Sequence, residues 1–221
     1  MVGDGISDAV PFGLPRLACR QGRIAPNAAY ADLGLALPAA LLRAVPQRQA
    51  EFMAGRLCAA LALRDLGAES VEVAVNPDRS PCWPVGFVGS ISHSGDQVVA
   101  VVAKAGDYRR LGVDIEPLMP EAQSRDLAET LLAPVDAAFC PAGVGFAAFV
   151  TLVFSAKEAF YKALSADLGR IIGFHEVRLC GIAPGEVRLA LVPGLGGAEH
   201  RLHYRWADGI CLTLLAEPCG G

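Results

Sequence analysis

The spacing of apolar residues predicts two successive groups of helices and strands. Residues 1–37 show little periodicity and predict an irregular lead-in with one or two short strands. Apolar residues then recur at helical intervals from Pro46, which suits the first turn of a helix, to a stop at Gly67. The elements predicted in this first group are helices over residues 38–42 and 46–66, and strands over residues 71–75, 87–92 and 97–103.

The second group has a similar make-up. Its predicted elements are a strand around Asp114 after a polar link over residues 104–110, helices over residues 122–132 and 146–168, and strands over residues 176–180, 187–192, 200–206 and 210–216. Each group contains a helix that ends in Asp-Leu-Gly, at residues 65–67 and 167–169. These patterns predict an α+β protein of two similar lobes with a pseudo-twofold relation, each a small antiparallel sheet packed with a long helix. The lobes are expected over residues 1–108 and 109–221, with a ligand cleft between them.

Composition narrows the classes of protein. The 221-residue chain is 53% hydrophobic, which is ample for a packed core, and its net charge of -4 provides no broad basic field. General nucleic-acid binding is therefore not expected, although a local basic cleft stays possible. Seven cysteines without Cys-x-x-Cys spacing predict reduced thiols. No apolar run reaches membrane-spanning length, and the first eight residues lack the order of a signal peptide. We therefore expect a cytoplasmic protein. Two lobes in one chain make a monomer the simplest expectation.

Three carboxylates are the candidate metal ligands. Side chains two positions apart on a strand point to the same face, so Asp114 and Glu116 would lie together. A helix over Glu158 could bring a third carboxylate to them, and such an oxygen set suits Mg²⁺, which also binds substrate phosphates. The alternative is that Asp114 and Glu116 are solvated residues of an edge strand, and the strand taken alone favours that alternative.

The segment around Glu158 also allows a structural interpretation. Ser155 followed by Glu158 three positions later fits a capping box at a helix start. Glu158 and Lys162 fit an ordinary ion pair between residues four apart on a helix. Lys157 fits a solvated lysine. From this segment alone, the catalytic and structural interpretations are about equally supported.

Five short sequence blocks occur in a fixed order along the chain. They lie at residues 48–56 (RQAEFMAGR), 83–84 (WP), 89–93 (GSISH), 112–116 (GVDIE) and 154–162 (FSAKEAFYK). Together they resemble the 4′-phosphopantetheinyl transferases of the surfactin and enterobactin type. One such block would carry little weight, whereas five in order are specific. The first block is most similar to the subgroup that serves enterobactin-like siderophore and fatty-acid systems.

The resemblance implies an activity and a metal. The enzyme would transfer 4′-phosphopantetheine from coenzyme A to a serine of an acyl or peptidyl carrier protein, in siderophore, polyketide or fatty-acid biosynthesis, and release adenosine 3′,5′-bisphosphate. Asp114, Glu116 and Glu158 would hold Mg²⁺, with Mn²⁺ as an alternative. Glu158 would also be the general base, but a carboxylate bound to a dication is a weaker base, so a metal-bound water is the alternative.

The resemblance also implies contacts to the two substrates. Those on the nucleotide side of coenzyme A would be Arg48, Arg56, Arg79, Ser92 and His93. Lys162 would contact the pyrophosphate or the leaving group, and Lys157 would be a second contact on the phosphate or metal side. A histidine at a hairpin tip is, by itself, more often structural or merely exposed. Residues 122–149 would help to receive the carrier protein, although a buried segment explains most of their apolar positions.

Two other functions stay open. One is a catalytically silent module that binds coenzyme A or a carrier protein, and the presence of all three carboxylates and Lys162 argues against it. The other is a metal-dependent phosphohydrolase built on the Asp-x-Glu pair. Such enzymes usually bind a second metal, and none of the four histidines is adjacent to that pair in the sequence.

Overall fold

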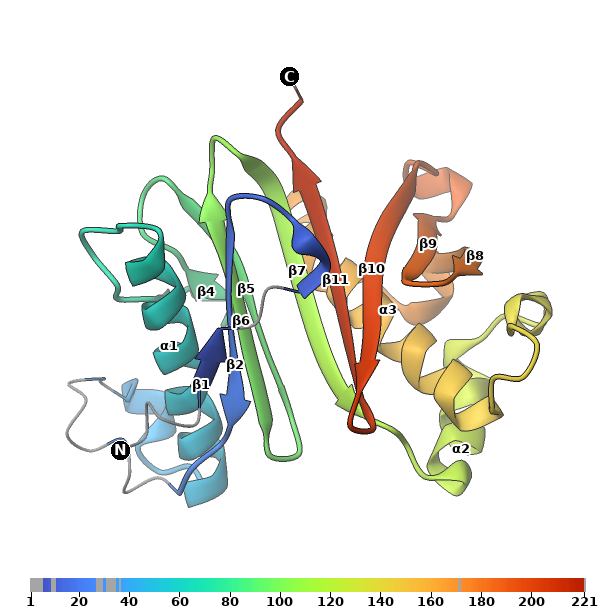
Figure 1. Ribbon diagram of the computed structural model, residues 1–221, viewed down its shortest axis with the longest axis horizontal. Helices are drawn as coiled ribbons and strands as arrows, with labels where there is room; N and C mark the ends of the chain where they lie inside the picture. The colour runs from blue at the N-terminus through green and yellow to red at the C-terminus, as the bar shows by residue number, and fades with distance from the viewer. Residues whose placement is uncertain are drawn as a thin grey trace. The chain divides into compact units, whose positions relative to one another are not determined.

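The structure is a computed structural model, and it describes residues 6–8, 11–26, 30, 35, 37–170 and 172–220. Contacts within the chain divide it into two compact units. The first is Met1–Leu111 with Glu217–Gly221, and the second is Gly112–Ala216. Each unit has a sheet and one long helix of its own, which Figure 1 traces from the blue N-terminus to the red C-terminus.

The first unit is built on a four-stranded sheet in the order β1-β2-β6-β5, and each neighbouring pair is antiparallel. Its elements are β1 (Ile6–Asp8), η2 (Pro11–Gly13), β2 (Leu17–Arg23), η4 (Ala39–Leu41), α1 (Pro46–Asp65), β3 (Ala74–Val75), β4 (Pro81–Cys82), β5 (Phe87–Ser94) and β6 (Gln97–Lys104). The strands β3 and β4 form a separate antiparallel pair. The central strand β6 is the most buried, because β2 and β5 flank it on both sides and α1 packs against it.

Small residues form much of the buried face of α1. Ala54, Cys58 and Ala62 are fully buried, and they share a core with Val98 and Val102 of β6. Short side chains let a helix axis approach a sheet closely, and dispersion contacts then replace water over the whole interface. The helix that the sequence predicts over residues 46–66 is confirmed, and this packing fixes which of its side chains point away from the sheet.

The second unit has a five-stranded sheet in the order β7-β11-β10-β9-β8. Its elements are β7 (Tyr108–Pro117), α2 (Glu121–Leu131), η5 (Asp136–Phe139), α3 (Phe146–Leu168), η6 (Phe174–Glu176), β8 (Val177–Ala183), β9 (Glu186–Leu191), η7 (Pro193–Leu195), β10 (Glu199–Ala207) and β11 (Ile210–Pro218). Strands β8 to β11 pair in succession as antiparallel neighbours. The long helix α3 shares one core with this sheet, in which Phe149, Phe160 and Leu202 are almost fully buried.

The predicted α+β class is confirmed, since each unit combines a sheet with one long helix. The helix predicted over residues 146–168 has the bounds of α3. The strand predicted over residues 71–75 is wrong in length, because β4 offers only two residues for β3 to pair with. The predicted polar link over residues 104–110 is also too long, because β7 begins at Tyr108. In the described part of the chain, no helix is long and apolar enough to cross a membrane.

Candidate functional site

Asp114 and Lys162 form an ion pair in the second unit. Asp114 lies on β7 with 3% of its surface exposed, and its Oδ1 accepts a hydrogen bond from Lys162 Nζ at 2.7 Å. The same ammonium donates to the carbonyl oxygen of Val113 at 3.2 Å. A buried carboxylate needs a counter-charge, and Lys162 supplies it. The interpretation of Asp114 as a solvated edge residue is therefore wrong.

Gly112 makes this pairing possible. A Cβ atom at this position would lie 1.9 Å from the carbonyl oxygen of Ala159 and 2.9 Å from the Cβ of Ala163. The backbone of β7 thus touches the backbone of α3, which only a residue without a side chain permits. Asp114 comes two residues after this contact on β7, and Lys162 comes three residues after Ala159 on α3. The close approach is what brings the two side chains together.

Ser155 lies inside α3 rather than at its start. Its Oγ is 2.9 Å from the Thr213 hydroxyl, which also donates to the Ser155 carbonyl oxygen at 2.9 Å, and both residues are fully buried. Because α3 begins at Phe146, two turns earlier, the capping-box interpretation of Ser155 and Glu158 is wrong. These hydroxyls instead tie α3 to β11, and so help to fix the part of the helix that carries Glu158.

Glu158 is half-buried on α3. Burial raises the pKa of its carboxyl group, the Lys162 ammonium partly offsets that rise, and the Asp114 carboxylate adds to it. The carboxylates of Glu158 and Asp114 are therefore close enough to repel each other. A cation that both could share would relieve this repulsion, which is the electrostatic setting that a divalent metal ion requires.

The third predicted ligand, Glu116, is partly exposed on β7. Burial raises the pKa of the Cys211 thiol, and the negative charges of Asp114 and Glu116 raise it further. Among the residues that the structure describes, no three His, Cys, Asp or Glu side chains group closely enough to hold a metal ion. The set of three ligands therefore stays a prediction. The residues present still fit a hard cation, because Asp114 already faces a positive charge, the ammonium of Lys162.

Lys157 is buried in the structure, whereas the sequence suggested a solvated lysine or a contact to phosphate. Its side chain is 2% exposed, and its Nζ donates to the carbonyl oxygens of Leu131 at 2.7 Å and Phe174 at 2.9 Å. Asp136 Oδ2, which accepts a hydrogen bond from the Ala133 amide, lies 4.0 Å from that Nζ. The interpretation as a solvated lysine is wrong, because the ammonium donates to two carbonyl groups and is buried, and the phosphate contact stays a prediction.

A pocket of about 240 Å³ lies beside Glu158. Its lining residues are Lys157, Glu158, Tyr161, Ile172, Gly173, Phe174 and Val177. Two sets of hydrogen bonds stabilise the side of the pocket that contains Phe174. Lys157 donates to the Phe174 carbonyl oxygen, and Arg170 makes a bidentate pair with Glu176 at 2.7 and 3.0 Å. Arg170 and the Gly173 amide lower the pKa of Glu176 to about 2, so the Glu176 carboxyl group is ionised near neutral pH. The pocket is mainly apolar, with Glu158 as an acidic group in its lining.

In the first unit, two predicted nucleotide contacts meet. Arg48 Nη1, on α1, lies 2.9 Å from His93 Nε2, on β5. Glu51, which the sequence analysis did not single out, accepts a hydrogen bond from the same Nη1 at 3.2 Å. The three side chains make one polar cluster, here called the Arg48 cluster, and Glu51 is the least exposed of them.

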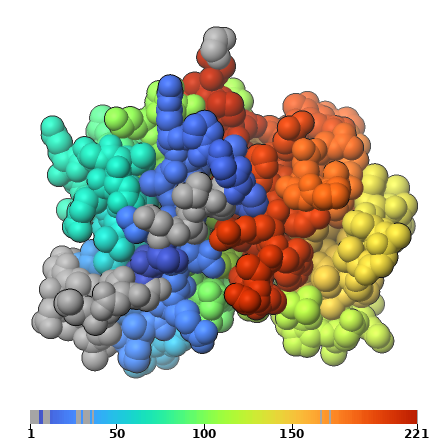
Figure 2. Space-filling view, in the orientation of Figure 1, coloured from blue at the N-terminus to red at the C-terminus, as the bar shows by residue number. Residues whose placement is uncertain are grey.

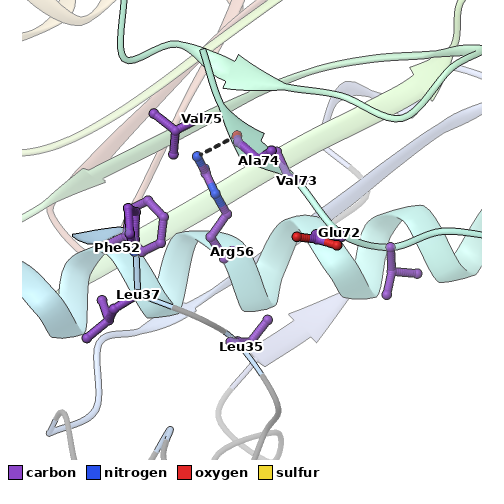
Figure 3. A pocket seen from close by; sticks show the side chains of 10 residues that line it. Leu35, Leu37, Phe52, Arg56, Glu72, Val73, Ala74 and Val75 are labelled. Carbon is purple, nitrogen blue, oxygen red and sulfur yellow. Dashed lines mark hydrogen bonds between the residues drawn. The ribbon is translucent and has the colours of Figure 1, made fainter. Parts of the chain in front are cut away.

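Arg56 lies at a pocket in the first unit with a volume of about 520 Å³ (Figure 3). The pocket is lined by Leu35, Leu37, Pro38, Phe52, Arg56, Val71, Glu72, Val73, Ala74 and Val75. Arg56 Nη2 donates to the Ala74 carbonyl oxygen at 3.2 Å, and the guanidinium carbon is 4.6 Å from the centre of the Phe52 ring. Burial lowers the pKa of Arg56, and its buried Nε donates to no described residue. An acidic or hydrogen-bonding ligand in this pocket would give that donor a partner.

The remaining two predicted contacts have different surroundings. Arg79 has a positive φ of 72° in the loop between β3 and β4, where Asp78 Oδ1 accepts hydrogen bonds from the amide and the hydroxyl of Ser80. This segment after α1, turquoise in Figure 2, lies at the surface of the first unit. Ser92 is only 5% exposed on β5, so its hydroxyl offers little surface to a ligand. Both assignments stay predictions.

Comparison with known protein families decides the class of this chain. The profile of the 4′-phosphopantetheinyl transferase N-terminal domain matches residues 36–103, and that of the 4′-phosphopantetheinyl transferase superfamily matches residues 110–213. The chain belongs to the 4′-phosphopantetheinyl transferase superfamily. The resemblance in five sequence blocks and the predicted enzyme class are thereby confirmed.

Individual relatives of this transferase agree with the profiles. It is 33% identical to enterobactin synthase component D of Salmonella typhimurium over 175 residues, which are 77% of this chain and 72% of the relative. It is 31% identical to the 4′-phosphopantetheinyl transferase Npt of Nocardia iowensis over 193 residues, which are 80% of this chain and 85% of the relative. The 4′-phosphopantetheinyl transferase PptT of Mycobacterium tuberculosis matches at 31% over 140 residues, 63% of this chain and 61% of the relative.

The sequence analysis missed three residues that shape the candidate site of this transferase. Glu51 could have been found, because a glutamate three residues after an arginine on a helix is within reach of it. Gly112 belongs to the block at residues 112–116, but the sequence does not show that α3 lies against it. The sequence around Asp136 gives no indication of its role, because its partner Lys157 is far away in the sequence and the two are buried together.

Proposed function

We propose that this chain transfers 4′-phosphopantetheine from coenzyme A to a serine of an acyl or peptidyl carrier protein, with the aid of Mg²⁺. The products are the modified carrier protein and adenosine 3′,5′-bisphosphate. The observation that carries the proposal is the buried Asp114–Lys162 pair beside the half-buried Glu158, in a unit that the superfamily profile covers. This is a site with acidic groups for a metal ion and an ammonium for phosphate.

Arg48 and Arg56 are the proposed contacts for the nucleotide of coenzyme A. They are eight residues apart on α1, about 12 Å apart along its axis and about 80° apart around it, so both can belong to one broad stripe of the helix. The pocket at Arg56 has a volume in the usual range for small-molecule sites and mostly apolar walls, which suits a base. His93, Ser92 and Arg79 are proposed as further contacts on the nucleotide side.

Asp114, Glu116 and Glu158 are the proposed metal ligands. A bound Mg²⁺ would polarise the phosphoryl oxygens and neutralise charge on the leaving phosphate. In this proposal Lys162 exchanges the Asp114 carboxylate for a pyrophosphate oxygen, because an ammonium needs only a small rotation to find a new acceptor. It would then stabilise the negative charge that grows on the leaving group.

The bond changes follow from this placement. The serine hydroxyl oxygen forms a bond to the β-phosphorus of coenzyme A, while the bond from that phosphorus to the bridging oxygen breaks and adenosine 3′,5′-bisphosphate leaves. The serine proton goes to Glu158, directly or through a water molecule. Burial supports the base role, because a carboxyl group with a raised pKa holds a proton more strongly than an exposed one.

The names of the relatives favour one biological setting. Several relatives are named enterobactin synthase component D, so we propose a carrier protein of siderophore biosynthesis as the first to test. Polyketide and fatty-acid carrier proteins come next. A monomer that acts in the cytoplasm is proposed, with residues 122–149 helping to receive the carrier protein.

The test is transfer by the purified protein with Mg²⁺, coenzyme A and a panel of apo carrier proteins. We expect the mass of one carrier protein to rise by one phosphopantetheine group, on the serine that receives it. Binding of coenzyme A without any mass gain would favour the silent binding module instead. Release of phosphate from coenzyme A without a carrier protein would favour the phosphohydrolase.

A further inference from the structure

Glu51 occupies a position in the Arg48 cluster that the proposed contacts alone do not explain. Its Oε2 lies 3.2 Å from Arg48 Nη1 and 3.9 Å from His93 Nδ1. The Glu51 side chain is 18% exposed, against 50% for Arg48 and 31% for His93. A carboxylate so close to a proposed phosphate site would repel a phosphate unless a positive charge in the same cluster neutralises it.

The hydrogen bonds show which groups the Glu51 carboxylate interacts with. Arginine has donors only, so the contact between Arg48 Nη1 and His93 Nε2 requires the histidine nitrogen to accept. The His93 ring is then neutral, and its proton is on Nδ1, the nitrogen that faces Glu51. Arg48 Nη1 thus lies between two acceptors, a carboxylate oxygen and an imidazole nitrogen.

The rest of the Arg48 guanidinium stays available. Both of its hydrogen bonds within the described part of the chain use Nη1. The edge formed by Nε and Nη2 is the one that binds a carboxylate in the Arg20–Asp65 pair of this same unit. Such an edge fits two oxygens of a phosphate equally well.

We propose that Glu51 is a positioning residue, which holds Arg48 so that its Nε–Nη2 edge faces the 3′-phosphate of coenzyme A. The inference rests on the function proposed above and adds a determinant of substrate choice to it. An exposed arginine loses rotamer freedom when a ligand orders it, and a side chain that is already ordered loses less. The ion pair with Arg48 also neutralises most of the Glu51 charge, so ordering outweighs repulsion.

The test compares coenzyme A with 3′-dephospho-coenzyme A, which lacks only the phosphate in question. The wild-type protein should use coenzyme A with the higher kcat/KM. Glu51→Gln should lower kcat/KM for coenzyme A about tenfold, through KM, and leave that for the dephospho form unchanged. A tenfold change corresponds to about 1.4 kcal/mol.

Two further variants make the result specific. Arg48→Gln should remove the same preference, and the Arg48→Gln, Glu51→Gln double variant should be no worse than Arg48→Gln alone, because the two residues act as one unit. Glu199→Gln is the matched control. Glu199 accepts from Arg188 Nη1 at 3.3 Å in an exposed pair, and its loss should change neither substrate.

The outcomes separate this inference from the proposed function. Equal losses for both substrates in Glu51→Gln, or tighter binding of coenzyme A, would overturn the positioning role. If the wild-type protein transfers nothing from either substrate, the proposed function fails. Calorimetric titration with the same two compounds then still decides the role of Glu51, through the ratio of their dissociation constants in each variant.

Discussion

Lys162 Nζ lies 2.7 Å from Asp114 Oδ1, so a proposed metal ligand is paired with a proposed substrate contact. A cation that binds Asp114 must therefore compete with the ammonium for the same oxygen. The pair gives the buried carboxylate a counter-charge, and it holds the lysine next to a proposed metal ligand. The proposed metal binding and the proposed phosphate contact would thus be coupled through one hydrogen bond.

Removal of Lys162 should separate these two effects. In Lys162→Met we expect Mn²⁺ to bind about tenfold more tightly without coenzyme A, because its competitor for Asp114 is gone. Transfer should still fall by a factor of 10² or more, since the leaving group loses its cationic contact. Electron paramagnetic resonance of free Mn²⁺ measures the first effect and carrier-protein mass the second. Weaker metal binding in this variant would show that Lys162 does not compete.

Asp114→Ala should abolish transfer and metal-dependent binding of coenzyme A together. The reason is that the variant removes the most buried of the three proposed ligands. Titration of coenzyme A with and without Mg²⁺ checks it. If the metal-dependent part of the binding survives intact, Asp114 is not a ligand.

Glu158→Gln addresses the base role. The amide keeps the size of the side chain and one possible metal oxygen, but it cannot take a proton. We expect turnover to fall more than affinity for coenzyme A, and steady-state kinetics with a saturating carrier protein gives both values. Equal losses in turnover and in affinity would assign Glu158 to metal binding only.

Lys157 makes a prediction about stability and pH. Burial lowers the pKa of its ammonium from 10.5 to about 8, and Asp136 partly offsets that change. Between these two pH values the unfolded state binds more protons than the folded state, so the lysine's contribution to the free energy of unfolding becomes more favourable as pH rises. We expect the wild-type protein to gain up to about 3 kcal/mol relative to Lys157→Met over this window.

Urea unfolding at a series of pH values from 7 to 10.5, with a chelator present, measures this difference. Lys104→Met is the control, because Lys104 is exposed. A flat difference for Lys157→Met would mean that its ammonium is solvated in the folded protein.

Substitutions of Arg79 test whether its strained backbone conformation supports the binding of coenzyme A. Its φ of 72° is costly for any residue with a side chain, so Arg79→Gly should raise the free energy of unfolding by about 1 kcal/mol. If the side chain contacts the nucleotide, the same variant should bind coenzyme A more weakly, whereas Arg79→Lys should keep the affinity. A stabilised variant with unchanged affinity would remove Arg79 from the site.

Much of the fold was predictable because its signals are local. Apolar spacing and the glycine stops located α1 and α3, and alternation located the hairpin of β5 and β6. The short β3 could not be predicted, since its length depends on what β4 offers as a partner. The start of β7 was missed for a related reason: polar residues at its beginning resemble a link until the strand that pairs with them is known.

The candidate site was predictable in residue type but not in pairing. Asp114, Glu158 and Lys162 follow from their sequence blocks, and the structure brings them into electrostatic contact. Lys157 has the same chemistry as Lys162 and lies five residues before it, yet it is buried against two carbonyl groups. Sequence alone does not distinguish these two lysines, because the difference depends on which side of α3 the neighbouring segments cover.

The contact at Gly112 has a consequence for altering this enzyme. Side chains that separate a strand from a helix can be exchanged for larger or smaller ones, and the two elements then shift apart or together. At Gly112 the main chain of β7 rests on the main chain of α3, where nothing can be exchanged. Variants made for new substrates can therefore change the surrounding pockets, whereas any side chain at position 112 would force the acidic strand away from the lysine-bearing helix.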